Sequence, residues 1–297
     1  MMPQPISREL RRAFGCVLRE WRAARQVSQL DLALSAGASV RHLSFVETGR
    51  ATPSRDFVLR LAEAMDLPLR ARNDLLVAAG YAPMFRESTM AEPPMASVKT
   101  ALDSILQQQE PYPALVLDRG WNVLMRNTAS LRMRRAFIDD KNLAAAGPAA
   151  KNAMKLIFDP LLYRPYVVDW KTTAEQILLR LRHEATEKNS PAGQLVEELL
   201  AYPGVPPINI PAPAPPNEPL MTVTLVKGML RIKYFSIIST FGTPQDITLQ
   251  ELRIKCFFPA DPETAVVFKR LAAEDPDGIG AKICWSAARP SGAGRRA

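Results

Sequence analysis

Residues 28–50 read SQLDLALSAGASVRHLSFVETGR and predict two short helices joined by a tight turn. Ser28 and Asp31 stand three residues apart, so their side chains can cap the free amides at the start of the first helix. The apolar side of this helix is expected at Leu30, Ala33 and Leu34. Gly37 can adopt the positive φ that ends a helix, so the first helix is predicted to stop near Ala36.

The second helix of this pair is predicted to begin after Ser39, a good N-cap residue. Leu43 and Val46 are three residues apart and form its buried side. The residues left on its other faces are Val40, Arg41, His42, Ser44 and Phe45. A helix, a short turn with glycine and a second helix match a helix-turn-helix that reads DNA with its second helix, although an ordinary helical hairpin has the same pattern.

The preceding helix, predicted over residues 7–25, adds a basic face to the reading unit. Its apolar stripe is Leu10, Phe14, Val17, Leu18 and Trp21. Its opposite face carries Arg8, Arg11, Arg12, Arg19, Arg22 and Arg25. Residues 1–60 contain ten arginines against five acidic residues, a net charge of +5, whereas the whole chain carries +8. More than half of the net charge therefore lies in the first fifth of the chain, as expected for a surface that meets phosphate.

Two further helices complete a predicted five-helix, all-α domain at residues 1–85. Ser54 can cap the fourth helix, whose inward residues are expected to be Val58, Leu61, Ala62 and Met65. Pro68 ends it, and a fifth helix follows over residues 70–79 and closes at Gly80. Residues 86–97 have no periodicity and contain two adjacent prolines, so an inter-domain linker is predicted there.

Residues 98–275 predict a second domain that combines a sheet with helices. Helices are expected over residues 98–109, from Asn127, and over 152–158, 172–188, 194–201 and from Asp261. Strands are expected over residues 114–117, 121–125, 221–226, 229–241 and 248–258. The order of these elements, with two strands, a helical insert and then three strands, predicts one antiparallel sheet of five strands. The chain as a whole is therefore expected to be α+β. The proline-rich residues 203–219 predict an extended crossover, and residues 276–297 a flexible basic tail.

Composition sets outer limits on the kind of protein. The chain has 297 residues, a mean hydropathy of −0.08 and a pI near 9.6. It has no run of 18 apolar residues and no apolar leader, so we expect a cytoplasmic protein without a membrane partner. Its three cysteines are too far apart for a metal or redox motif. The basic balance favours nucleic acid as the partner.

The reading unit resembles a known family in its motifs. These are SQ at 28–29, LA at 32–33, Gly37, LSFVE, the glycine of ETGR and PSRDFVLRLAEAM, and they resemble the Xre/Cro-type, lambda-repressor-like helix-turn-helix family over residues 6–80. The longer stretch from Arg41 to Pro83 is similar to one branch, the regulators with an MmyB-like ligand-binding domain. Three further stretches resemble motifs of that domain: PYPALVLDRGWNVLMRN, RPYVVDW and TFGTPQDITLQELRIKCFFPAD. The first of them, a hairpin followed by an Asn-capped helix, resembles the start of a PAS domain.

The resemblance implies a DNA-binding surface. Its expected residues are Ser28, Gln29, Ser39, Val40, Arg41, His42, Ser44, Phe45, Arg50 and Arg55. Arg41 is the first choice for a base reader, because a guanidinium can bond two acceptors of guanine at once. Phe45 is expected either to contact a thymine methyl group or to pack, and Arg50 and Arg55 to hold phosphates. Since one such domain makes few base contacts, a homodimer on a palindromic site is expected.

The resemblance also implies that the second domain is a sensor with an internal pocket for a small hydrophobic, fatty-acid-like ligand. No other cofactor is expected. The residues proposed to line the pocket are Phe158, Tyr163, Arg164, Trp170, Phe235 and Phe241, with Met133, Phe137 and Met154 as further candidates. Arg164 is the residue expected to meet a carboxylate. Any one of these apolar side chains has plain core packing as the alternative.

Two other function classes are weighed against a regulator of transcription. An enzyme is not expected, because the sequence has no GxSxG, HExxH, P-loop or GxGxxG motif, and His183-Glu184 lacks the second histidine of a zinc site. An antitoxin or phage-type repressor, whose C-terminal half binds a protein partner or only dimerises, is the stronger rival. That reading requires a small or disordered C-terminal half, whereas this one has the signals of a full domain.

Overall fold

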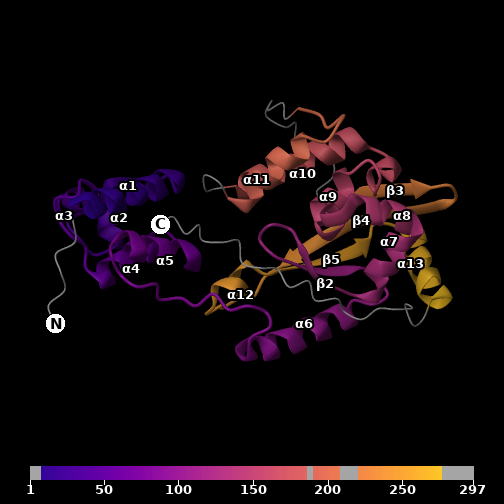
Figure 1. Ribbon diagram of the computed structural model, residues 1–297, viewed down its shortest axis with the longest axis horizontal. Coiled ribbons are helices and arrows are strands. Elements are labelled where there is room, and N and C mark those ends of the chain that lie inside the picture. Colours follow the sequence, from indigo (N-terminus) through magenta and orange to yellow (C-terminus); the bar gives the residue numbers. More distant parts are fainter. Residues whose placement is uncertain (1–7, 186–189, 208–219, 276–297) are drawn as a thin grey trace. The chain divides into compact units, whose positions relative to one another are not determined.

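The structure, a computed structural model, describes residues 8–185, 190–207 and 220–275. Within it the chain divides into two units (Figure 1). The first comprises the chain up to Ser88 together with residues 242–250, and the second comprises the remainder. The division falls within the predicted linker at 86–97. The predicted basic tail and most of the proline-rich segment lie outside the described residues.

The first unit contains the five helices that the sequence predicts. They are α1 (Arg8–Ala24), α2 (Gln29–Ser35), α3 (Val40–Glu47), α4 (Arg55–Ala64) and α5 (Leu69–Ala78). The predicted caps form at Ser28, Ser39 and Ser54, whose hydroxyl oxygens accept the third backbone N–H of α2, α3 and α4 at 3.1, 3.1 and 3.2 Å. The Asp31 carboxylate accepts the Ser28 hydroxyl at 2.6 Å, so the cap of α2 ties the two side chains together.

The core of the first unit is formed by apolar side chains from all five helices. It includes Phe14, Leu18, Leu32, Ala33, Leu43, Val46, Phe57, Leu61, Leu75 and Leu76. The predicted apolar side of α2 is wrong in part, because Leu30 and Leu34 are 53% and 68% exposed. Leu32 and Ala33 are buried instead. The cap at Ser28 and the turn at Gly37 fix the helical phase of this short helix, and this phase points Leu32 inward.

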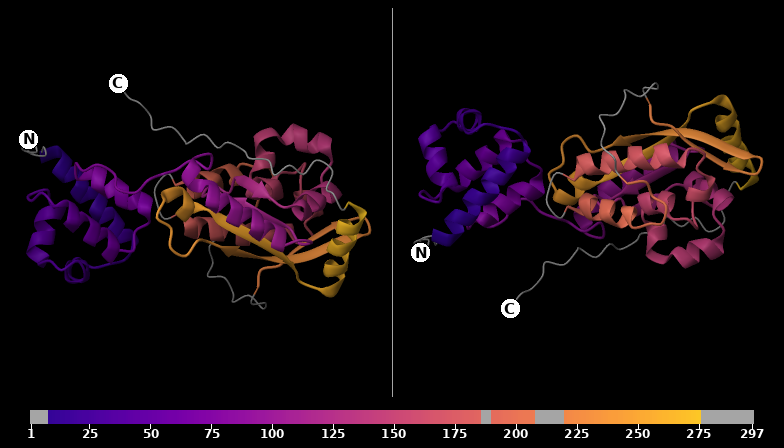
Figure 2. Two further views of the ribbon diagram at one scale, coloured as in Figure 1. Left: turned by 90° about the horizontal axis from the view of Figure 1, so that it is seen from below. Right: turned by 90° about the horizontal axis from the view of Figure 1, so that it is seen from above.

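The second unit contains the predicted five-stranded antiparallel sheet, so the α+β fold class is confirmed (Figure 1). Its strands are β1 (Ala114–Leu117), β2 (Val123–Arg126), β3 (Val223–Lys227), β4 (Leu230–Ser239) and β5 (Arg253–Pro259). Their order across the sheet is β2-β1-β5-β4-β3. The first hairpin therefore pairs with the last strand, and β4 and β5 run side by side through the unit (Figure 2).

Helices surround this sheet. They are α6 (Ala96–Gln108), α7 (Thr128–Phe137), α8 (Asp140–Ala146), α9 (Ala153–Phe158), α10 (Trp170–Glu184), α11 (Pro191–Leu200) and α13 (Pro262–Glu274), with short 3-10 turns at Pro93–Met95, Gly147–Lys151 and Arg164–Tyr166. The remaining short helix, α12 (Ile247–Glu251), belongs to the first unit except for its last residue. Asn127 and Asp261 cap α7 and α13 as predicted.

The strand predicted over residues 248–258 begins five residues later than expected. Asp246 accepts the backbone N–H groups of Thr248 and Leu249 at 2.8 and 3.3 Å, so these residues form the first turn of α12. This local cap decides against an extended conformation, and β5 starts only at Arg253.

Candidate nucleic-acid interface and ligand pocket

Helix α3 presents one face to solvent and one to the core. Val40, Arg41 and His42 are exposed, whereas Leu43 and Val46 are fully buried. Since Ser39 caps the helix, the exposed residues occupy its first turn, the part of a reading helix that contacts base edges. The structure therefore gives the predicted reading residues the exposure that this role needs.

A buried carboxylate holds α3 against the two helices before it. Glu47, the last residue of α3, is 3% exposed. Its carboxylate accepts Arg22 Nε from α1 at 2.8 Å and Gln29 Nε2 from α2 at 2.8 Å. Because both partners are satisfied by one buried acceptor, Glu47 fixes the position of Gln29, one of the residues expected at the DNA-binding surface. The sequence analysis missed this role of Glu47.

Close backbone approach between α1 and α3 is possible only because residue 15 is glycine. A Cβ atom added at Gly15 would lie 2.2 Å from the carbonyl oxygen of Glu47. Real atoms do not approach so closely, and the obstacle is backbone, which cannot rotate away. Gly15 therefore sets the distance between α1 and the reading helix.

Arginines surround the exposed end of α3. The guanidinium carbons of Arg41 and Arg50 lie 5.4 and 5.9 Å from the centre of the Phe45 ring. Arg55 is the exposed first residue of α4. Within the described ranges, these three arginines make no ion pair, so their charges are open to an anionic partner. Phe45 is half-buried and packs under two of them, which favours the packing role over a free thymine contact.

The remaining expected DNA-binding residues have mixed environments. Ser28 and Ser39 are exposed and use their hydroxyl oxygens as helix caps. Ser44 is half-buried, and its carbonyl oxygen accepts the Thr48 hydroxyl at 2.7 Å. The exposed His42 ring lies 5.1 Å from the ring of Phe57. The ten residues thus lie on or beside α2, α3 and the start of α4, although their contacts with DNA remain a prediction.

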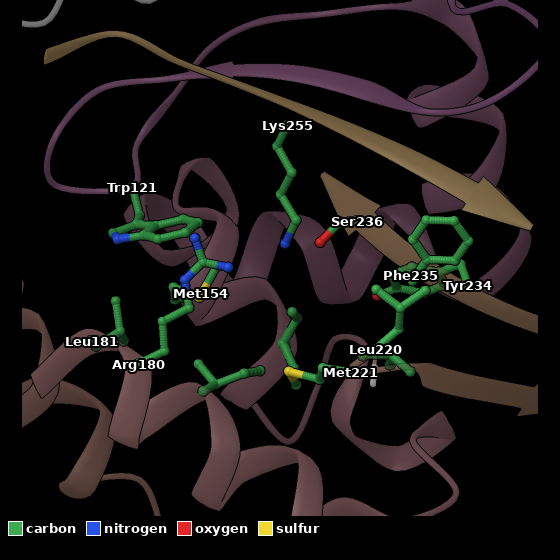
Figure 3. Close-up of a pocket in the computed structure, with 13 residues that line it drawn as sticks. Trp121, Met154, Arg180, Leu181, Leu220, Met221, Tyr234, Phe235, Ser236 and Lys255 are labelled. Carbon is green, nitrogen blue, oxygen red and sulfur yellow. The ribbon is translucent and has the colours of Figure 1, made fainter. Parts of the chain in front are cut away.

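A cavity of about 100 Å³ lies in the second unit, between the sheet and α10 (Figure 3). Most of its lining is apolar or aromatic, and includes Trp121, Met154, Ile157, Leu181, Met221 and Phe235. Tyr234, Phe235 and Ser236 of β4 and Lys255 of β5 form its sheet side. Such an apolar cavity with a few polar groups is typical of sites for small molecules.

Lys255 is the polar group that points into this cavity (Figure 3). Its side chain is 8% exposed, and its amino group faces the Arg180 guanidinium and the Ser236 hydroxyl. In the part of the chain that the structure describes, this amino group has neither a hydrogen bond nor an ion pair. Burial, together with the nearby positive charge of Arg180, lowers the pKa of Lys255 from 10.5 to about 8. The lysine is thus a mostly protonated, unpaired cation at neutral pH.

Two neighbouring cations, Arg180 and Arg253, share a single carboxylate. Glu184 accepts Arg180 Nε at 3.2 Å, Arg253 Nη1 at 2.6 Å and Trp121 Nε1 at 3.2 Å. The Arg180 and Arg253 guanidinium groups also lie over the Trp121 ring, at 5.3 and 4.9 Å from its centre. The Lys255 amino group has no carboxylate partner in the described ranges and lies 5.8 and 5.1 Å from the centres of the Trp121 and Phe257 rings. An apolar molecule with an anionic group fits this arrangement.

A second cavity of about 50 Å³ adjoins the first. The two share Ile157, Tyr234 and Lys255 in their linings. The second continues to Met133, Arg134 and Tyr163, and burial raises the pKa of the Tyr163 hydroxyl well above its ordinary value, so this group stays neutral. Lys255 and Tyr234 therefore stand at the junction of two apolar chambers.

The residues predicted to line the pocket fall into two groups. Phe235 lines the first cavity and Tyr163 the second, as do the further candidates Met154 and Met133. Phe158, Trp170 and Phe241 line neither of these cavities. Phe158 is fully buried and packs edge-on against Trp170, and Phe241 is half-buried two residues after β4.

The expectation that Arg164 meets a carboxylate is at odds with the geometry. Its guanidinium donates a hydrogen bond to the carbonyl oxygen of Pro203 and lies 4.6 Å from the centre of the Trp170 ring. These contacts occupy it at the surface, outside both cavities. Lys255 lines both cavities, Arg180 lines the first, and Arg126 and Arg134 line the second; the sequence analysis selected none of these cations.

Neither a bilayer-spanning helix nor a metal cluster occurs in the described ranges. No helix there is long and apolar enough to cross a bilayer. The same ranges hold no group of three or more histidine, cysteine or acidic side chains placed to bind a metal ion.

Comparison with protein families matches both units of the chain. The MmyB-like transcription regulator ligand binding domain matches residues 98–271, and a helix-turn-helix domain matches residues 13–75. The first match covers more than half of the chain. No curated protein matches the chain.

Two solved structures are similar to part of the chain. The restriction-modification controller protein C.AhdI from Aeromonas hydrophila is 35% identical, with a TM-score of 0.20, over 21% of this chain and 94% of its own. The clp gene regulator ClgR from C. glutamicum is 30% identical, with a TM-score of 0.22, over 26% of this chain and 92% of its own. The assignment of the chain depends on the family matches, because these alignments cover only 21% and 26% of it.

Proposed function

Because this chain belongs to the MmyB-like transcription regulators, we propose that it reads a specific DNA sequence with α3 and that a small hydrophobic anion in its second unit modulates this activity. The family matches support the general part of this proposal, that the chain is a DNA-binding transcription regulator with a ligand-binding domain. The observation that carries the DNA-reading part is the exposed, capped first turn of α3 with Arg41. Since its target is DNA, the proposal places the protein in the cytoplasm.

Recognition of DNA is divided between two kinds of contact. Arg50 and Arg55, with the exposed Arg12 and Arg19 of α1 and the exposed Arg25 just after this helix, neutralise phosphates and supply affinity without sequence preference. Arg41 donates two hydrogen bonds to the major-groove edge of guanine and supplies selectivity. Glu47 holds α3 in place through Arg22 and Gln29, so the reading residues are positioned before DNA arrives.

We expect two copies of the chain to bind one palindromic site, since one reading helix contacts only a few base pairs. The test is selection of binding duplexes from a random pool with the full chain, followed by light scattering of the complex. The expected result is a selected duplex with two inverted half-sites about one helical turn apart, and a complex with two chains. A single chain on the selected duplex, or no enrichment of any sequence, would contradict the proposal.

The ligand part of the proposal rests on the environment of Lys255. An alkyl chain would displace water from the apolar lining, and a carboxylate would pair with the unpaired amino group of Lys255. Fatty acids have this chemistry, so they are the proposed ligand class. The match of the ligand-binding domain over residues 98–271 supports this reading over a C-terminal half that only binds a protein partner.

Affinity for the fatty acid laurate should fall with pH above about 8. Only the protonated Lys255 attracts a carboxylate, and its pKa is about 8, so the dissociation constant should rise about tenfold per pH unit above that value. Lys255→Met should bind laurate weakly and without this pH dependence. Calorimetric titration from pH 7 to pH 10 measures both, with Lys269→Met, a change at an exposed lysine of α13, as the control. A pH profile of Lys255→Met equal to that of the wild type would exclude Lys255 as the anchor.

The lowered pKa of Lys255 should also make the free energy of unfolding depend on pH. Between pH 8 and 10.5 the unfolded chain binds more protons at Lys255 than the folded chain does, so the free energy of unfolding should rise with pH in this range. Below pH 8 both states are protonated and the burial penalty is present in full. Lys255→Met removes this penalty, and its urea midpoint at pH 7 should be at least that of the wild type.

A further inference from the structure

Residues 242–250, here called the arm, connect β4 to β5 but belong to the first unit. The chain leaves the second unit after Phe241, makes its contacts within the first unit, and returns at Glu251. An ordinary hairpin loop of this length would stay with its own strands. The DNA-binding unit thus contains a segment whose two ends continue directly into the two central strands of the ligand-binding sheet.

The arm is fixed to the first unit by a row of hydrogen bonds. Asp246 Oδ2 accepts the Ser88 N–H at 3.1 Å, and the Thr248 hydroxyl donates to the Ser88 carbonyl at 2.6 Å. The Ile247 N–H donates to the carbonyl of Arg86 at 2.9 Å. Ile247 and Ser88 are each 3% exposed. Ile247 and Ser88 are buried, whereas Asp246 and Thr248 are half-buried, so the arm packs against the unit instead of projecting from it as a free surface loop.

Gln250 supplies a cap that α5 lacks. Pro68 precedes α5 and offers no side-chain hydrogen bond to its first turn. Gln250 Oε1 accepts the N–H of Leu69, the first residue of α5, at 2.7 Å. A free N–H at the start of a helix is stabilised by such an acceptor. The first turn of α5 therefore depends on a side chain that stands five residues before Lys255.

The other end of this connection is the pocket. Ser236 stands six residues before the arm and Lys255 five residues after it, and both line the first cavity. In the sheet Ile238 pairs with Lys255 and Ser236 with Phe257, so β4 and β5 form one hydrogen-bonded ribbon from the pocket to the arm. At about 3.3 Å per residue, this ribbon spans only roughly 20 Å.

Entry of a long ligand must disturb this ribbon. The two cavities hold about 100 and 50 Å³, whereas ligand pockets usually hold at least about 300 Å³. An alkyl chain fits only if the chambers join at their shared residues. Two of these, Tyr234 and Lys255, are on β4 and β5.

We propose that the arm transmits occupancy of the pocket to the DNA-binding unit, through the bonds of Asp246, Thr248 and Gln250. The proposal rests on the proposed function and names how its two sites are coupled. Ligand binding shifts β4 and β5, the arm follows because it is continuous with both strands, and the first turn of α5 follows because Gln250 caps it. Coupling between two sites needs a structural element whose conformation is shifted by binding at either site, and we assign this role to the arm.

The test compares Gln250→Ala with Gln245→Ala in the full chain. Gln245 is an exposed residue of the same arm, so its variant is a matched control. The affinity for the selected duplex is measured with and without saturating laurate. For the wild type and Gln245→Ala we expect laurate to change this affinity about fivefold or more. For Gln250→Ala the change should fall below about twofold, while laurate affinity stays within twofold of the wild type.

Hydrogen exchange of the wild type provides a second, variant-free readout. Laurate should change deuterium uptake in residues 242–250 and at the start of α5, as well as in the pocket. If Gln250→Ala keeps the full laurate effect, or if uptake changes only in the pocket, the arm proposal is overturned while the proposed function stands. If the wild type binds neither laurate nor a selected duplex, the proposed function itself fails and the arm has nothing to transmit.

Discussion

Replacing Arg41 with alanine is expected to leave the protein folded and to remove its preference for the selected duplex over random duplex. Arg41 is exposed on the first turn of α3, and its packing on Phe45 makes only a small contribution to stability. A bidentate contact between arginine and guanine is worth about 1–3 kcal/mol of discrimination. A dimer loses two such contacts, so the preference should fall at least about thirtyfold when both contribute in this range.

Competition binding of labelled selected duplex against random duplex measures this loss. Arg55→Ala provides a matched control, because Arg55 is also exposed and is expected to contact phosphate. It should weaken binding to both duplexes equally and reduce the dependence on salt by about one ion per chain. If Arg41→Ala discriminates as well as the wild type, Arg41 has no part in reading bases.

The second large effect is expected at Gly15. Gly15→Ala places a Cβ atom 2.2 Å from the carbonyl oxygen of Glu47, so α1 and α3 must separate. Overpacking of this kind typically costs about 1–3 kcal/mol, and a backbone obstacle places it at the upper end or beyond. Because the same displacement strains the bonds from Glu47 to Arg22 and Gln29, DNA binding should be lost together with stability.

Urea denaturation followed by circular dichroism, with hydrogen exchange resolved by peptide, assigns the destabilisation to α1–α5. Gly242→Ala makes the same chemical change in the same unit, where the added Cβ meets no atom within 4 Å. Its denaturation midpoint should match that of the wild type. A normal midpoint and normal DNA binding for Gly15→Ala would show that α1 and α3 can separate without cost.

Much of the fold follows from short-range features of the sequence. Ser28, Ser39 and Ser54 mark helix starts because a cap needs only a hydroxyl and an amide three residues later, and all three form. The sheet could be predicted from the strand order in the chain, since an insert between the first two strands and the last three is a recognisable pattern. The prediction that Leu30 and Leu34 lie on the buried side of α2 was wrong because it used residue spacing alone. In so short a helix, two different faces fit the same spacing of apolar residues.

The site depends more on contacts between distant residues, and less of it could be predicted. Lys255 lies in RIKCFF, where alternation suggests a solvated lysine, and only the fold reveals that α10 covers it. Glu47 likewise reads as a polar end of a helix, although Arg22 lies 25 residues earlier in the chain. The last three residues of the arm, 248–250, were predicted as the start of a strand, because no local signal shows that Gln250 bonds to a residue 181 positions away.

The most direct test of the central claim is methylation interference at guanine N7 on the selected duplex. N7 lies in the major groove, so methylation there blocks a guanidinium without altering the phosphates. We predict that methylation of one guanine in each half-site prevents binding of the wild type, and that Arg41→Ala loses this sensitivity at the same guanines. An identical interference pattern for the wild type and Arg41→Ala, or no interference at any guanine, would contradict the account.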